Sequence, residues 1–143
     1  KAIGISKKKA MSLSDQFCVE RHKKSFFDLV NNKLDITFAN EQEILSLIDA
    51  KNFNEVISFA KQLGKLIIIT RSSKGSIAIN KNEIVECDSQ KDLKIVDLTG
   101  AGDLFAAGFL HGHVNNLSIK KSLEKGIEMA SKVIQVFGAR LKN

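Results

Sequence analysis

Four consecutive large apolar residues, Leu66-Ile67-Ile68-Ile69, limit the possible folds of this chain more than any other stretch. The run has the length of a β-strand. Successive strand side chains point to opposite faces of a sheet, so both faces must be covered here. Strands of this kind lie in the middle of parallel sheets that carry helices on both sides. The run therefore predicts a layered α/β architecture.

Strand-like and helix-like stretches alternate along the rest of the chain. Asn40 and Asn54 are expected to cap two helices, since Asn is a preferred residue at a helix N-terminus. The alternation is typical of an α/β fold with a mainly parallel sheet, whose functional loops gather at the C-terminal ends of the strands. Strands are predicted at residues 10–13, 34–39, 66–69, 76–80 and 83–87, the last two as a hairpin, and helices at 17–29, 41–50, 54–62, 102–113 and 118–137.

The segment Asp97-Leu98-Thr99-Gly100-Ala101-Gly102-Asp103 carries the clearest chemical signal. It joins the apolar stretch 94–96 to an apolar helix through a turn with two glycines, which permit positive φ and close approach. Free N–H groups and the positive dipole end of the helix favour an anion there. Asp103 would lie in the first helical turn, where a carboxylate can take a hydroxyl proton during phosphoryl transfer. The alternative is an ordinary glycine-rich turn with Asp103 as a favourable charge at a helix start.

This string resembles the C-terminal signature of the ribokinase-like family of carbohydrate and purine kinases, D-T-x-G-A-G-D-x-F-x-x-G-F, with Leu98 in place of the first Thr. The resemblance implies a three-layer α/β fold in which a mainly parallel sheet is flanked by helices. It also implies that Asp103 is the catalytic base. The backbone of Gly100, Ala101 and Gly102 would form the anion hole, and Gly102 would also contact the nucleotide.

Asn40 and Glu43 follow the strand predicted at 34–39. On spacing alone they form a capping box, in which Asn40 caps the helix and Glu43 bonds back to it. A carboxylate at this place can also hold a Mg²⁺-bound water or orient a phosphate oxygen. The resemblance favours the second role, because family members carry an N-x-x-E motif for Mg²⁺ and phosphate here.

The loop Thr70-Arg71-Ser72-Ser73-Lys74-Gly75 follows the apolar strand. It resembles the family's T-x-G-x-x-G loop, which contacts the nucleotide. Thr70 and Gly75 fit that pattern, but Ser72 stands where Gly is common. The alternative is a surface turn before the hairpin.

The segment Phe137-Gly138-Ala139-Arg140 resembles the family's terminal G-A loop, which helps to enclose the adenine and a monovalent-cation site. By the same resemblance, Asp97 and Thr99 are candidate partners of a K⁺ ion. The alternative is that Asp97 is a structural residue that fixes the conformation of the turn.

The resemblance implies transfer of the ATP γ-phosphoryl group to a hydroxymethyl group of a sugar or purine nucleoside, with Mg²⁺ and possible K⁺. Residues 12–22 resemble bacterial adenosine-kinase-like sugar kinases, which favours an adenosine-like acceptor. Residues 1–143 correspond to the C-terminal half of such kinases, with the N-terminal half and the lid absent. The alternative is therefore a truncated or split half that binds nucleotide, self-associates or needs a partner, and is inactive alone.

The charge and cysteine content limit the partners and the compartment. The net charge is +6, but the lysines are scattered and the cluster Lys7–Lys9 has no interleaved aromatic residue, so nucleic acid is not expected. No apolar run approaches the ~20 residues of a membrane span. Cys18 and Cys87 show no metal-type spacing and read as reduced thiols, which favours the cytoplasm.

Overall fold

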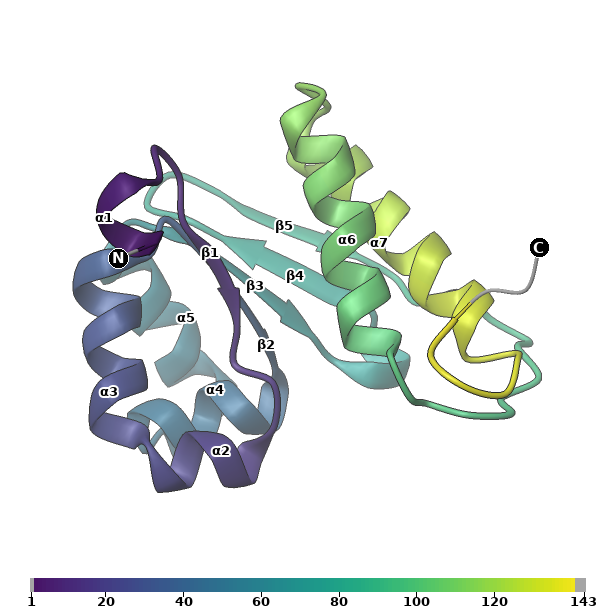
Figure 1. Cartoon of the computed structure of the whole chain (residues 1–143), viewed down its shortest axis with the longest axis horizontal. Helices are drawn as coiled ribbons and strands as arrows, with labels where there is room; N and C mark the ends of the chain where they lie inside the picture. Colours follow the sequence, from purple (N-terminus) through teal and green to yellow (C-terminus); the bar gives the residue numbers. More distant parts are fainter. Residues whose placement is uncertain (1, 141–143) are drawn as a thin grey trace. The chain divides into compact units, whose positions relative to one another are not determined.

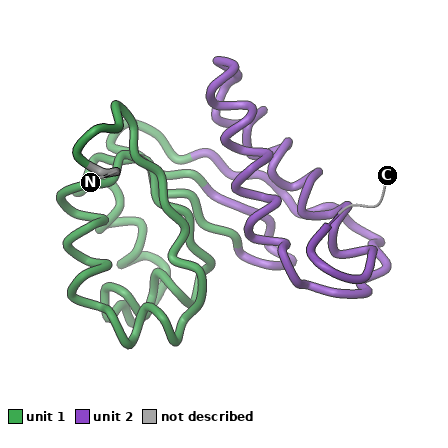
Figure 2. Tube along the Cα trace, in the orientation of Figure 1, with its two compact units in different colours: residues 1–70, 78–84 green, residues 71–77, 85–143 purple. Residues whose placement is uncertain are grey.

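A computed structural model describes residues 2–140 of the chain. These residues form two compact units (Figure 2). One unit holds the chain up to Thr70 together with Ala78–Ile84, and the other holds Arg71–Ile77 together with the chain from Val85 onward.

Three parallel strands form the centre of the first unit (Figure 1): β1 (Ala10–Ser12), β2 (Ile36–Asn40) and β3 (Leu66–Thr70). The register pairs Phe38 of β2 with Ile68 of β3. Ile67, Ile68 and Ile69 are all 0% exposed, so the apolar run forms the central strand that it predicts.

The first unit also contains the helices α1 (Ala2–Ile5), α2 (Gln16–Arg21), α3 (Lys23–Asp28), α4 (Glu41–Ile48) and α5 (Phe53–Leu63). α4 packs on β2 and β3 and contacts α2, α3 and α5. The single helix predicted over 17–29 is wrong. His22 interrupts it with φ −120°, and a π-helical turn, Leu29–Lys33, follows α3.

Helix caps explain where α4 and α5 begin. Asn40 caps α4, as predicted, and does so in the complete capping box that the spacing alone indicates. Asn54 does not cap α5. Asn52 does so, since its side chain accepts a hydrogen bond from the Glu55 N–H, and Asn54 lies within the first turn. The sequence offered two asparagines, and the helix starts at the earlier one.

The strands β4 (Ser76–Ile79) and β5 (Ile84–Cys87) form the predicted hairpin and are divided between the two units. The N–H of Asn80 donates to the carbonyl of Glu83 across the connection, at 3.1 Å. The five strands follow the order β1-β2-β3-β4-β5, so a parallel part and a hairpin together make a mixed sheet. The α/β fold class predicted from the sequence is confirmed.

The second unit is built around the helices α6 (Ala101–Val114) and α7 (Ile119–Val133), which lie side by side (Figure 1). Their backbones approach closely at Gly108, where an added Cβ would lie 2.5 Å from the carbonyl oxygen of Lys125. The helix predicted over 118–137 ends early, at Val133, and turns follow it. Residues 94–96 lie outside the strands, and the N–H of Val96 donates to the carbonyl of Ile134 instead.

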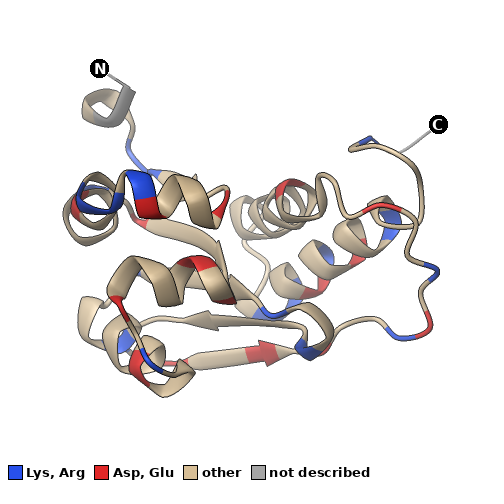
Figure 3. Cartoon of the chain, turned by 90° about the horizontal axis from the view of Figure 1, so that it is seen from below, with Lys and Arg blue, Asp and Glu red and all other residues tan. Residues whose placement is uncertain are grey.

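Basic and acidic side chains are interspersed along the chain (Figure 3). None of the helices within residues 2–140 has the length and apolar character needed to cross a bilayer.

Candidate active site

The turn before α6 requires a glycine at one position. Gly100 is the N-cap of α6 and has φ +79°, in the left-handed region. A Cβ added there would lie 2.8 Å from the Cβ of Ala139, which is closer than real Cβ contacts. Backbone conformation and packing therefore both require glycine at this position. The turn lies directly against the segment around Ala139.

The first amides of α6 are available at the positive end of its dipole. The N–H of Ala101 donates to Leu98, at 3.2 Å, and the N–H of Leu104 donates to Gly100, at 2.9 Å. The amides of Gly102 and Asp103 lie between them, and within the described residues neither donates to a backbone carbonyl outside the helix. No side chain of the described residues caps this end of α6. Such a terminus can accept the oxygens of a phosphate group.

Asp103 lies in the first turn of α6, where the sequence predicts it, and its side chain is exposed. Gly102, one residue earlier, is exposed as well, and a Cβ added to it would meet no atom within 4 Å. The folded chain therefore does not itself require glycine at 102. The open space beside these amides leaves room for an anion to approach the backbone.

Asp97 links the turn to the segment that follows α7. Its Oδ1 accepts hydrogen bonds from the Thr99 N–H, at 2.8 Å, and from the Thr99 hydroxyl, at 2.7 Å. Its Oδ2 accepts a hydrogen bond from the Gly138 N–H, at 2.9 Å. The Thr99 hydroxyl above all, and then the two amides, hold the pKa of Asp97 below its usual value. These contacts support the structural interpretation of Asp97.

The side chains of Asn40 and Glu43 hold each other. Glu43 is 4% exposed, and its two carboxylate oxygens accept from the N–H and the side-chain amide of Asn40, at 2.9 and 2.8 Å. In return, Asn40 Oδ1 accepts from the Glu43 N–H at 2.8 Å. Burial raises the pKa of Glu43, the hydrogen bond from the Asn40 N–H opposes this, and the nearby charge of Asp15 raises the pKa further. A direct metal bond would disrupt this box, whereas a water-mediated contact leaves it intact.

The loop after β3 is shaped by two residues with positive φ. Ser72 has φ +52°, in the left-handed region, which explains why glycine is common at that place in the resembling pattern. Gly75 has φ +80°, and an added Cβ would lie 2.0 Å from the carbonyl oxygen of Cys87. The N–H of Arg71 donates to Gly75 at 2.8 Å, and the Ser89 hydroxyl donates to the carbonyl of Ser73 at 2.7 Å. The loop is thus held against the end of β5.

The structure brings the predicted residues together in two groups. In the first unit, Asn40 and Thr70 are register partners at the carboxyl ends of β2 and β3, and Glu43 lies one helical turn beyond Asn40. In the second unit, the turn from Asp97 to Asp103 forms one contiguous group. Gly75 belongs to the second unit but is fixed by β5 rather than by that turn.

Two interactions near the predicted site residues were not predicted from the sequence. The contact of Asp97 with Gly138 joins residues that are 41 positions apart, and no local motif signals it. Asp15 caps α2 through the Cys18 N–H, at 2.8 Å, and its charge acts on Glu43. Asp15 lies two residues beyond the strand predicted at 10–13, and no motif there signals either contact.

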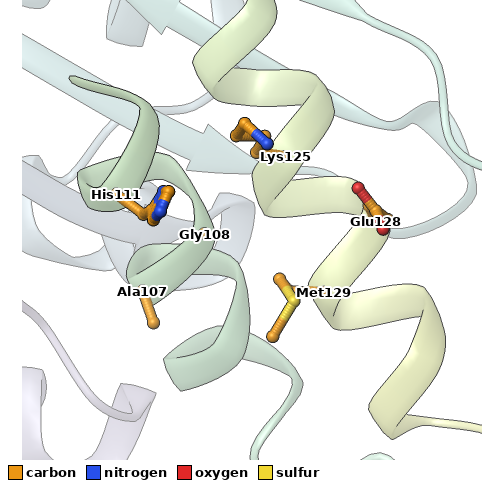
Figure 4. Close-up of a pocket in the computed structure, with 6 residues that line it drawn as sticks. All are labelled: Ala107, Gly108, His111, Lys125, Glu128 and Met129. Atoms are coloured by element: carbon orange, nitrogen blue, oxygen red, sulfur yellow. The ribbon is translucent and has the colours of Figure 1, made fainter. Parts of the chain in front are cut away.

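A cavity of about 280 Å³ lies between α6 and α7 (Figure 4). Figure 4 shows His111 and Met129 on facing helices beside it. None of the predicted site residues lines it, and it begins a turn beyond Asp103 on α6. It is lined by Ala107, Gly108, His111, Lys125, Glu128 and Met129. We therefore place the candidate active site at the turn and not at this cavity.

The fold and the start of α6 define an α/β protein in which a glycine turn leads into a helix N-terminus without a side-chain cap. The chain belongs to the pfkB family of carbohydrate kinases, whose family model matches residues 5–143.

Sugar and nucleoside kinases are among the proteins that this chain is similar to. Adenosine kinase from Sinorhizobium meliloti superimposes with a TM-score of 0.90 and 37% identity, over 94% of this chain and 41% of that one. A probable sugar kinase from Rhizobium etli CFN 42 gives a TM-score of 0.89 and 37% identity, over 93% and 41%. Cytidine kinase from Thermococcus kodakarensis is 32% identical over 75% of this chain and 39% of its own length. The chain thus spans about two fifths of the length of each of these relatives.

Proposed function

We propose that the chain provides the phosphate-binding turn and the catalytic base of an ATP-dependent kinase. The main support for this proposal is the start of α6, where the exposed Asp103 follows Gly100 in a left-handed conformation and no side chain of the described residues caps the helix N-terminus. Membership of the pfkB family supports the reaction class.

In this proposal the acceptor hydroxyl transfers its proton to Asp103 while its oxygen bonds to the γ-phosphorus of ATP. The bond from that phosphorus to the β–γ bridging oxygen breaks, and ADP leaves. Gly100, Ala101 and Gly102 would form the anion hole. In it the Gly102 amide, the neighbouring Asp103 amide and the helix dipole stabilise the charge on the transferred group, since the Ala101 N–H already donates to Leu98. Mg²⁺ would neutralise phosphate charge, with Glu43 contacting it through water and Asn40 holding Glu43 in place. Thr70 and Gly75 would shape the loop that contacts the nucleotide.

We further propose a hydroxymethyl group of a sugar or nucleoside as the acceptor, with adenosine-type nucleosides favoured. The support is the similarity to the adenosine kinase of Sinorhizobium meliloti and to the cytidine kinase of Thermococcus kodakarensis. We place the reaction in the cytoplasm, since Cys18 and Cys87 are both free thiols.

The test is a phosphorylation assay with MgATP on a panel of nucleosides and sugars, with MgATP affinity measured in parallel. Wherever turnover is observed, with this chain alone or with added polypeptide, Asp103→Asn should lower it by about 10²- to 10⁴-fold, the usual contribution of a general base, and leave the MgATP affinity nearly unchanged. Asp92→Asn is the matched control, because Asp92 is an exposed aspartate of the same unit and should tolerate the change.

The outcomes distinguish a chain that is active alone from a chain that needs further polypeptide for activity. Turnover that Asp103→Asn abolishes supports a kinase that is active as it stands. MgATP binding without turnover supports the alternative, a half that holds nucleotide and needs further polypeptide. Turnover that survives in Asp103→Asn refutes the proposed base, and absence of both binding and turnover refutes the proposed function.

A further inference from the structure

The segment before α6 and the segment after α7 are joined by several contacts within the second unit. The N–H groups of Val96 and Asp97 both donate to the carbonyl of Ile134, at 2.8 and 3.2 Å. Farther along, Gly100 leaves no room for a Cβ beside Ala139. The anion-binding turn thus depends on residues 134–139 for its position.

Asp97 supplies the side-chain link in this junction. Its half-buried carboxylate accepts three hydrogen bonds, two from Thr99 and one from the Gly138 amide. Hydrogen bonds to a charged carboxylate are stronger than those between neutral groups. The lowered pKa of Asp97 agrees with a carboxylate that is held by donors.

The donor set around Asp97 differs from that of a cation site. K⁺ is bound by several converging oxygens, whereas N–H and O–H donors converge on this carboxylate. Two hydrogen bonds at Oδ1 use both of its lone pairs, and the Gly138 amide uses one at Oδ2. The Thr99 hydroxyl, the other side-chain oxygen predicted to hold K⁺, is itself bonded to Asp97. The residues present therefore fit a closed hydrogen-bond link better than a K⁺ ligand set.

We propose that Asp97 is a positioning residue that ties the anion-binding turn to residues 134–139 by direct hydrogen bonds, and that this link forms without a monovalent cation. The link itself is independent of the proposed function. Only its consequence for MgATP affinity rests on that function.

The first experiment needs no variant. Amide hydrogen exchange of Gly138 and Thr99 is measured in the wild-type chain in KCl, NaCl and choline chloride at equal ionic strength. We expect the same protection in all three salts, within about twofold. Protection in KCl that exceeds protection in choline chloride by tenfold or more would overturn the proposal.

The second experiment removes the link. In Asp97→Asn the side-chain oxygen can still accept the hydrogen bonds from Thr99. The NH₂ group then faces the Gly138 N–H, and because both are donors the hydrogen bond to Gly138 is lost. We expect exchange at Gly138 to accelerate by tenfold or more. Thr99→Val is the matched control, because it removes one hydroxyl and keeps both amides, so exchange at Gly138 should stay near that of the wild type. Unchanged exchange in a folded Asp97→Asn chain would refute the role.

MgATP affinity then connects the link to the site. Asp97→Asn should weaken MgATP binding by about tenfold, and replacement of K⁺ by choline should not weaken it in the wild type. If the wild type binds no MgATP at all, the proposed function fails while the exchange data still decide the role of Asp97. If exchange proves dependent on K⁺ while MgATP binds, the Asp97 proposal fails and the function stands.

Discussion

Gly100 and Gly102 are two positions apart, but the physical reasons for glycine differ between the two positions. Gly100 has a left-handed backbone and touches Ala139, so the folded chain itself requires glycine there. Gly102 is helical and faces open space, so nothing in the chain requires glycine there. If the phosphate group approaches this backbone as proposed, the requirement at 102 comes from the ligand.

This contrast gives a paired prediction. Gly100→Ala should destabilise the chain by about 1–3 kcal/mol, from backbone strain and overpacking. Gly102→Ala should leave stability unchanged or slightly raised, because Ala favours a helix, and should weaken MgATP binding by tenfold or more. Urea denaturation and calorimetric titration measure the two quantities. A Gly102→Ala chain that binds MgATP as tightly as the wild type would argue against the phosphate position.

The two cysteines should differ in reactivity. Cys87 is 7% exposed, and its burial raises the pKa of the thiol, so the reactive thiolate is scarce. Cys18 is half-exposed. Iodoacetamide at pH 8 should therefore modify Cys18 well before Cys87, as followed by mass spectrometry of the folded chain. Cys18→Ser serves as the control, since it should leave almost no early labelling. Equal rates at the two thiols would contradict the burial of Cys87.

At the scale of elements, α6 packs closely against α7, and the turn leads directly into α6. Gly108 and Gly112 of α6 lie against the backbone of α7, and Gly126 of α7 lies against Phe105. An added Cβ at 112 would lie 2.9 Å from the Ser122 hydroxyl oxygen, and one at 126 would lie 2.9 Å from the Phe105 ring. Small residues on both helices therefore allow the close contact that orients the first turn of α6.

Gly108→Ala tests this packing. The added Cβ would meet the Lys125 carbonyl at 2.5 Å, and the backbone of α7 would have to move. Overpacking should outweigh the gain in helix propensity and cost about 2 kcal/mol of the free energy of unfolding. Gly102→Ala on the same helix is the matched control. Equal stability of the two variants, measured by urea denaturation, would show that the helices separate easily.

Elements specified by adjacent residues were predictable from the sequence. The strand at Leu66–Ile69 follows from an unbroken apolar run, and the Asn40–Glu43 box follows from residues three positions apart. The break at His22 was not predictable, because neither glycine nor proline marks it. The start of α5 was not predictable either, because the local sequence does not show whether Asn52 or Asn54 caps the helix.

The same distinction applies to the site. Asp103 at the start of α6 was predictable, because a glycine-rich turn and a helix start are local features. The bond from Gly138 to Asp97 was not, because chain folding alone brings these residues together. The family pattern suggested a K⁺ ion bound by Asp97 and Thr99, whereas Asp97 accepts direct hydrogen bonds from Thr99 within the turn and from Gly138 of the segment after α7.

At the scale of the whole molecule, the chain matches only part of the length of its relatives. It covers 41% of the Sinorhizobium meliloti adenosine kinase and 39% of the Thermococcus kodakarensis cytidine kinase. Many enzymes, kinases among them, close a loop or a lid over the site to exclude water before the chemical step. The predicted phosphate turn and base lie within residues 97–103, whereas nothing in the described residues is assigned to the acceptor.

We therefore expect turnover to depend on additional polypeptide. The part of the Sinorhizobium meliloti enzyme outside the matched segment, co-expressed with this chain, should restore ATP-dependent phosphorylation of adenosine that neither part shows alone. Product formation is measured by chromatography of adenosine and AMP. Asp103→Asn in this chain is the control and should abolish the restored activity, because the base would come from this chain. Full turnover by this chain alone, or a stable complex of the two parts without turnover, would contradict a division of labour in which the partner supplies the acceptor site.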